Sequence, residues 1–595
     1  MIGNYLKVAL RTFRKHPVYA CVNVLGLGVA IGTCLLIGLY VQDELRYDTF
    51  HPQAHRTLAL VIESDLLDSP QQTGPSAFAP LLETEIPEVE HVTRTDPDRS
   101  VHLTPRARRR GGGIREGRVL EADSSFFDVF PGFPVRRADR DEVLDAPGEA
   151  VLTASAARSL FGDQNPVGRV LRADSDSTRR YTVVGITRVP EHSTVQFDAV
   201  VRAPTPSRSP ESWKQFSGQV YARVGEEVRP DTLAATVWEA APSEEMKVAD
   251  GVDMVPLPAL YLSDAYSADG FKAQPRYLYL FGSLGLLILL IAGFNYVNLA
   301  VSQVDRRTGE VGIRRTMGAR RRQIVGQFLV ETLVLTTAAL GVGVGLAAGA
   351  LPAFNALFGK TLTLAASQHM GVLVGGIGGV LALTLIAGAY PAFVLSGFRP
   401  AHTLRGASTT TVGGGDWLQR GLVVAQFAVS TGLIFGTIVI YQQLDYLQTK
   451  DLGFEEEQVV TVPLGDLNPE RGRTLRRLAA DHPAVQHATI GSGTPGEIGL
   501  RVANMNPNEV SDSARVQDRE IDVSPVEVDT SYVETLGLTV IAGRRFGEVS
   551  PARQRSGYIL NEETVRAFGW TPETAVGQPF SLFGGGPRRG RKFPH

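Results

Sequence analysis

The side chains best suited to chemistry in this 595-residue chain are few and scattered. His51 and His55 are four residues apart in "HPQAH", a spacing at which two histidines can share a metal ion. The segment begins with a proline-containing turn and no third ligand is in view, so we interpret both as surface histidines. The two cysteines, Cys21 and Cys34, lie in one apolar run and offer neither a disulfide framework nor a thiolate metal site.

Catalytic and nucleotide-binding motifs are absent from the sequence. It contains no HExxH, GxSxG or CxxC, and no Walker A sequence that could cradle the phosphates of ATP. We therefore expect no catalytic residue, no metal and no cofactor, and we expect that the chain cannot hydrolyse ATP alone. The arginine-rich stretch at 105–113 is interpreted as a surface loop, without nucleic-acid binding.

A second group of side chains suits docking to another protein. The segment "RRTGEVGIRRTMGARRRQI", residues 306–324, places seven arginines in nineteen residues. Its centre, 309–317, predicts a short helix that ends in a turn at a glycine. A short helix at the membrane surface can dock in a cleft of a partner. The candidate docking residues are Glu310, Val311, Gly312, Ile313, Arg314, Arg315, Met317 and Gly318.

The chemistry of this segment depends on its residue types. Val311, Ile313 and Met317 would supply the apolar contacts, while Glu310 could pair with an arginine of the partner or with Arg314. The alternative is that the arginines only orient the chain in the membrane. Seven arginines exceed what orientation requires, so we favour docking.

The elements that must position this segment are apolar runs long enough to cross a bilayer. Each exceeds the roughly 20 residues that a transmembrane helix needs. No Asp, Glu, Lys, Arg or His is expected deep in any span, which argues against an ion-coupled carrier or a proton pump. The predicted transmembrane helices are 17–42, 277–304, 329–359, 370–398 and 421–444.

The distribution of basic residues predicts the orientation of these spans. Short connections rich in Lys and Arg stay in the cytoplasm, and the three basic segments, 1–16, 305–328 and 399–420, then all lie on that side. The long regions 43–276 and 445–595 lie outside. Residues 1–16 predict an amphipathic helix on the membrane surface; the alternative is a simple basic flank.

Two spans carry a glycine at every fourth position. Small residues at this spacing let two helices approach closely, so we predict helix packing there. These residues are Gly341, Gly345, Gly349, Gly371, Gly375 and Gly379.

The outer regions share an internal repeat. Short strand-like runs alternate with turns and helical pieces, which is typical of α+β domains. "ADSSFFDVF" from Ala122 corresponds to "VDTSYVETL" from Val528, and Phe161-Gly162 with Val167-Gly168 corresponds to Phe568-Gly569 with Val576-Gly577. We therefore interpret the chain as a duplication of one span plus one outer domain.

These motifs resemble the FtsX/MacB-like permeases of ABC transporters. The arginine-rich segment resembles their cytoplasmic loop, and "NPVGRVL" with "NEETVRAFGW" resembles their periplasmic core domain. The resemblance implies an integral membrane α-helical protein with α+β extracytoplasmic domains: a core domain at 43–276 and a coupling loop at 305–328. Long members have eight spans, so the five predicted here and an incomplete second domain at 445–595 suggest truncation of the second half.

The resemblance also implies partners and a mechanism. A separate cytoplasmic ABC ATPase dimer would move the coupling loop of a multi-pass protein of the bacterial inner membrane, and the outer domains would respond. The work would be export, lipoprotein extraction or envelope remodelling, with an envelope accessory protein as a further partner. The alternative is a membrane-anchored extracytoplasmic sensor or binding protein without an ATPase. A pure sensor would have no need of a docking loop.

Overall fold

The computed structural model describes most of the chain, in two compact units that are treated separately. The described residues are 2–64, 70–98, 103–105, 119–137, 143–173, 179–203, 210–213, 216–242, 246, 249–263, 274–302, 313–314, 316–364, 371, 375–376, 378–382, 416–450, 453–454, 459–462, 464, 469–492, 502–505, 521–523, 525–546 and 557–578.

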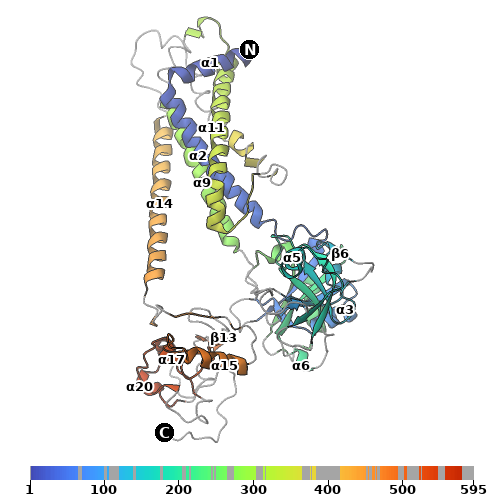
Figure 1. Ribbon diagram of the computed structural model, residues 1–595. Coiled ribbons are helices and arrows are strands. Elements are labelled where there is room, and N and C mark those ends of the chain that lie inside the picture. Colours follow the sequence, from blue (N-terminus) through green and yellow to red (C-terminus); the bar gives the residue numbers. More distant parts are fainter. Residues whose placement is uncertain are drawn as a thin grey trace. The chain divides into compact units, whose positions relative to one another are not determined.

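The membrane unit consists of long apolar helices and one short amphipathic helix (Figure 1). Four helices of the described part are long and apolar enough to cross a membrane. Helix α2 packs against both α9 and α11, and α14 packs against α9. The helices are α1 (Ile2–Lys15), α2 (Pro17–Glu44), α9 (Pro275–Ser302), α11 (Arg321–Phe358) and α14 (Asp416–Thr449).

The helix bounds correct several predicted ones. Helix α11 begins at Arg321, so the last eight residues of the predicted coupling loop 305–328 are helical. Arginine and glutamine are good helix formers, and at the start of the helix the Arg320 backbone N–H donates to Gln323 Oε1 at 2.8 Å. Helix α14 begins at Asp416, inside the predicted linker 399–420. Most of the predicted span 370–398, the rest of that linker and the tail beyond 578 lie outside the described residues.

The first outer domain is built on a mixed sheet with helices on its faces. Its strand order is β12-β1-β11-β3-β5-β10-β7-β9-β8-β4, with β2 on β11 and β6 on β9. The strands are β1 (Thr57–Glu63), β2 (Thr73–Pro75), β3 (Val89–Asp98), β4 (Leu103–Pro105), β5 (Val119–Ala122), β6 (Val135–Arg137), β7 (Glu149–Thr153), β8 (Val170–Ala173), β9 (Arg180–Thr187), β10 (Ala199–Arg202), β11 (Phe216–Val224) and β12 (Gly251–Pro256). The helices are η1 (Ala54–Arg56), α3 (Phe78–Glu85), α4 (Phe126–Val129), α5 (Ala154–Phe161), α6 (Pro210–Trp213), α7 (Pro230–Ala240) and α8 (Leu257–Leu260).

Strand β1 contributes side chains to two hydrophobic cores, one on each face of the sheet. Leu58, Leu60 and Ile62 belong to the core that α3 and α7 cover. Ala59 and Val61 belong to the core of α4 and α8 on the opposite face. Alternating side chains point to opposite faces of a sheet, so the first strand after α2 is held from both sides.

The second outer region repeats local features of the first. Its described elements are α15 (Pro469–Ala480), β13 (Val502–Met505), β14 (Ile521–Val523), α17 (Tyr532–Thr535), α19 (Glu562–Ala567) and α20 (Pro572–Ala575). Helices α5 and α19 both begin at a side-chain N-cap, Thr153 and Asn561, each accepting from the backbone N–H three residues on.

The glycines of the Phe-Gly and Val-Gly pairs have similar φ angles in the two copies. Gly162 and Gly168 have φ of 63° and 81°, and Gly569 and Gly577 have 71° and 83°. Glycine adopts this left-handed region without the Cβ penalty of other residues. The repeated Phe-Gly and Val-Gly pairs therefore mark the same turns.

The cap of α5 gives a first testable prediction. Thr153→Ala removes the oxygen that accepts from the Ala156 N–H, a 3.2 Å hydrogen bond. We expect a loss of about 1 kcal/mol in the free energy of unfolding, measured by denaturant titration of the purified chain. Thr153→Ser keeps the acceptor and is the control. Equal destabilisation by serine and alanine would contradict a capping role.

Candidate functional site: from the arginine-rich segment to the outer domain

The described part of the arginine-rich segment is a helical turn joined to α11. Ile313, Arg314 and Thr316 are helical, and Met317 N–H donates to the Ile313 carbonyl at 3.1 Å. Gly318 follows with φ of 94°, the conformation that favours glycine at a helix end. Glu310, Val311, Gly312 and Arg315 lie outside the described residues.

Two apolar side chains of this turn face away from the described protein. Ile313 is 59% exposed and Met317 is 83% exposed. Arg314 points the other way and its guanidinium donates to Gln327 Oε1 on α11 at 3.1 Å. The turn therefore presents apolar surface outward while one arginine ties it to α11. The docking role of these residues stays a prediction.

Helix α1 lies against the beginning of α11. Ala9 is 1% exposed, and a Cβ atom added at Gly326 would lie 3.9 Å from Tyr5. Leu6 and Leu10 are 44% and 51% exposed. The predicted amphipathic helix is thus present, but its apolar face divides between α11 and the surroundings.

The close approach of α2 and α11 uses glycines other than the predicted ones. A Cβ atom added at Gly343 would lie 2.8 Å from Ile31 Cγ2 and 2.9 Å from the Gly28 carbonyl oxygen. One added at Gly32 would lie 2.9 Å from the Gly343 carbonyl oxygen. The signal that we missed is the four-residue spacing of Gly28 and Gly32 in the first span.

The six glycines that we predicted make no such contact with the described helices. No described atom lies within 4 Å of a Cβ atom added at Gly341, Gly345, Gly349, Gly375 or Gly379, and at Gly371 the nearest, Gln42 Nε2, is 4.0 Å away. The three of these glycines on α11 lie on a ridge that is rotated away from α2, so they make no close contact with a described helix. Packing against residues outside the described part stays a prediction.

Helix α11 also carries a buried acidic side chain and a buried hydroxyl. Glu331 is only 7% exposed although it lies in the eleventh position of α11. Beside it in sequence, the hydroxyl of Thr332 hydrogen-bonds with that of Tyr296 on α9 at 2.7 Å. Our prediction concerned charged residues deep in a span, whereas Glu331 is the third residue of the predicted span 329–359 and precedes the uncharged run 332–359.

A buried carboxylate, that of Asp48, follows α2 in the sequence and belongs to the outer domain. Asp48 follows four residues after the helix ends, is 0% exposed and has φ of 56°. Its carboxylate accepts from Ser193 Oγ at 3.2 Å, and from the N–H and Oγ1 of Thr194 at 3.0 and 2.6 Å. Burial raises the pKa of Asp48 to about 6, against the effect of these hydrogen bonds.

His51 is buried next to this loop, which corrects our interpretation of it as a surface histidine. It is 3% exposed and packs among Phe50, Phe130 and Phe133. Its Nδ1 accepts from the Gly132 N–H at 3.0 Å. Burial lowers the pKa of His51 to about 4, so it is neutral near pH 7. His55 is exposed.

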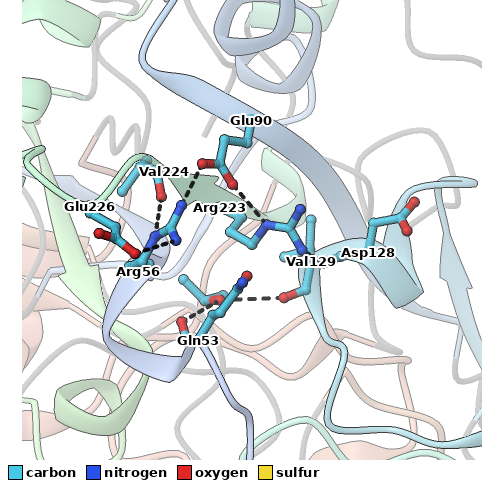
Figure 2. A network of polar contacts seen from close by, with 9 residues as sticks. Gln53, Arg56, Glu90, Asp128, Val129, Arg223, Val224 and Glu226 are labelled. Carbon is cyan, nitrogen blue, oxygen red and sulfur yellow. Dashed lines mark hydrogen bonds and ion pairs between the residues drawn. The ribbon is translucent and has the colours of Figure 1, made fainter.

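A polar network then fixes the entry to β1 (Figure 2). Arg56 donates to the Val224 carbonyl at 2.7 Å and pairs with Glu90, which also accepts from Arg223 at 3.3 Å. The Thr57 hydroxyl lies 3.3 Å from the carbonyls of both Gln53 and Val129. The residues between α2 and β1 are thus tied to β3, β11 and α4, and sequence patterns gave no sign of these long-range pairs.

Comparisons with known proteins agree with this arrangement. Residues 20–240 match the family model of the MacB-like periplasmic core domain, and residues 282–400 match that of the FtsX-like permease C-terminal domain. The first matched region covers most of α2 and the first outer domain as far as the end of α7. The second covers most of α9, the arginine-rich segment and α11.

Several relatives are similar to parts of the chain. The macrolide export ATP-binding/permease protein MacB of Wolinella succinogenes is 23% identical over 58% of this chain and 53% of its own length. That of Bdellovibrio bacteriovorus is 26% identical over 43% of this chain and 38% of its own length. The ABC transporter permease YknZ of Bacillus subtilis is 35% identical over 21% of this chain and 30% of its own. The chain thus spans about half or less of these relatives.

Two solved structures are also similar. The periplasmic region of MacB from Actinobacillus actinomycetemcomitans is 14% identical, with a TM-score of 0.25, over 34% of this chain and 90% of that one. The extracellular domain of YknZ from Gram-positive bacteria is 16% identical, with a TM-score of 0.24, over 33% of this chain and 99% of that one. On its two family-model matches and these MacB and YknZ relatives, the chain belongs to the FtsX/MacB-like permeases of ABC transporters.

Proposed function

We propose that the chain is a permease subunit that transmits ATP-driven motion of a separate cytoplasmic ATPase to its outer domain. Family membership supports an ATPase partner. The curated MacB relatives are named ATP-binding/permease proteins, whereas this sequence contains no Walker A motif. The basic segments, and with them the N-terminus, would lie in the cytoplasm of a bacterial cell.

The observation that carries the proposal is the exposed apolar pair Ile313 and Met317 at the base of α11. Apolar side chains surrounded by arginines fit a protein cleft with an acidic rim better than they fit water. Two features support transmission: α11 packs on α2 through glycines, and the chain continues from α2 to the first strand of the outer domain.

The test is association with the ATPase. Ile313→Asp places a charge in an apolar contact, which we expect to cost roughly 2 kcal/mol or more and to remove the co-purifying ATPase while membrane insertion stays normal. Glu310→Lys should act in the same direction. Ile313→Leu is the matched control and should retain the ATPase. Unchanged co-purification with Ile313→Asp would favour the second candidate, a membrane-anchored sensor without an ATPase.

The outer domain would carry out the process that the ATPase drives. Export, lipoprotein extraction and envelope remodelling are the processes we propose, with an envelope accessory protein as a further partner. Quantifying envelope proteins in the same co-purification would identify that partner, and finding none with an intact ATPase complex would count against it.

A further inference from the structure

The outer ends of α2 and α11 are joined by a small cluster of charges. Lys360 Nζ lies 2.9 Å from Asp43 Oδ2 and 2.7 Å from Glu44 Oε1. The side chains of Asp43, Glu44 and Lys360 are 8%, 3% and 17% exposed. Because two carboxylates share one ammonium in a poorly hydrated place, removing the lysine would take away the cation that both of them contact.

The chain after α11 is shaped to hold Lys360 in place. Gly359 ends α11 in the left-handed conformation, with φ of 62°. The Asn355 side chain then accepts from Leu362 N–H at 3.1 Å and donates to the Leu362 carbonyl at 2.9 Å. These hydrogen bonds close the turn around Lys360. A cation at this place also suits the negative end of the α11 dipole.

Aromatic rings surround the same helix ends. Tyr40 on α2 contacts Phe281 of α9 and Phe358 of α11, with ring centroids 5.3 and 5.4 Å apart. Lys360 Nζ lies 5.8 Å from the centroid of the Tyr40 ring. The rings keep water from one side of the charge cluster, which strengthens the attraction between its charges.

We infer that Lys360 is a positioning residue that fastens the outer end of α11 to α2, so that movement of α11 reaches the residues that enter the outer domain. This inference rests on the function proposed above. The glycine contact joins the two helices near the middle of their length, and apolar and aromatic contacts such as Tyr40 with Phe358 continue it. Apolar contacts of this kind are not directional, so they let the helices slide or rotate slightly. A second fastening at the outer end prevents this movement and holds Asp43 and Glu44, which immediately precede the connection to Asp48.

The fastening itself is tested without nucleotide. In Lys360→Met, amides of Val41–Arg46 should exchange hydrogen roughly tenfold faster in the full chain in nanodiscs, because the end of α2 opens locally. Lys360→Arg should restore protection. Lys450→Met is the matched control: Lys450 also follows a membrane helix and lies 5.9 Å from a tyrosine ring centroid. Exchange in Lys360→Met that equals wild type would overturn the inference.

The role in transmission is tested with Mg-ATP on the chain purified with its co-purifying ATPase. The triple variant Asp43→Asn/Glu44→Gln/Lys360→Met has no buried charge at the cluster and should keep wild-type thermal stability and ATP hydrolysis. We expect wild type to show an ATP-dependent change in exchange at Tyr47–Glu63, and the triple variant to lose most of it while keeping the change at Arg314–Phe328.

The outcomes separate the two proposals. Equal ATP-dependent changes at Tyr47–Glu63 in wild type and triple variant would overturn the role of Lys360 and leave the proposed function standing. Absence of any ATP-dependent change in wild type would overturn the proposed function and, with it, transmission through Lys360. The nucleotide-free comparison would still decide whether Lys360 fastens the helix ends.

Discussion

Gly343→Leu is expected to separate α11 from α2, whereas Gly345→Leu, two residues away, is expected to leave the membrane unit intact. A leucine at position 343 would place its Cβ 2.9 Å from the Gly28 carbonyl oxygen and 2.8 Å from Ile31 Cγ2. The carbonyl belongs to the backbone and cannot turn aside. The helices must therefore move apart, which we expect to cost about 3 kcal/mol of folding free energy.

Gly345 is the matched control because it has the same residue type, helix and apolar surroundings. No described atom lies within 4 Å of a Cβ atom added there. The measurement is the thermal unfolding midpoint of the purified chain in detergent, together with the monodisperse fraction. A wild-type midpoint for Gly343→Leu would contradict the contact. Equal loss at both positions would show that the glycine ridge also packs against residues outside the described part.

This pair of glycines shows where sequence reasoning succeeds and where it stops. The length and hydropathy of the spans are local properties, and α2, α9, α11 and α14 lie where long uncharged runs predicted helices. Their ends are less well defined, because Arg321 continues a helix as readily as an apolar residue does. Glycine spacing predicts a small-residue ridge, but only the rotation of α11 decides that Gly343 faces α2.

The residues after α2 show the same limit. His51 and His55 look alike in sequence, yet one is buried and the other exposed. Burial of His51 depends on Phe130 and Phe133, about 80 residues away along the chain, and on an apolar core that periodicity alone cannot assemble. The internal repeat, by contrast, depends on caps and turns that are themselves local, and its motifs therefore predicted corresponding geometry.

The buried pair Asp48 and His51 leads to the second large prediction, a pH dependence that single variants should reveal. Burial raises the pKa of Asp48 from 3.8 to about 6 and lowers that of His51 from 6.5 to about 4. Asp48 thus contributes stability fully present below pH 4 and lost as the pH rises to 6. His51 contributes stability present above pH 6.5 and lost as the pH falls to 4. Each shift corresponds to roughly 3 kcal/mol.

In wild type the two contributions oppose each other between pH 4 and 6. Asp48→Asn should make the outer domain less stable, relative to wild type, as the pH falls through this window, because only the histidine term remains. Asparagine suits the site because it tolerates a positive φ and can bond to Thr194. His51→Asn keeps an acceptor for Gly132 and should give the opposite slope: stability rises, relative to wild type, as the pH falls.

The measurement is hydrogen exchange of β1 amides in the full chain at pH 4, 5 and 6, corrected for the intrinsic exchange rate. The double variant is the control. Its pH dependence should be close to that of wild type, because the two contributions oppose each other in wild type and are both absent from the double variant. A lower starting stability of His51→Asn, expected from the space that the imidazole leaves, shifts its curve without changing the slope. Slopes of the same sign in the two single variants would mean that at least one of the two groups titrates near its ordinary pKa. The residues that follow α2 would then not combine a carboxylate of raised pKa with a histidine of lowered pKa.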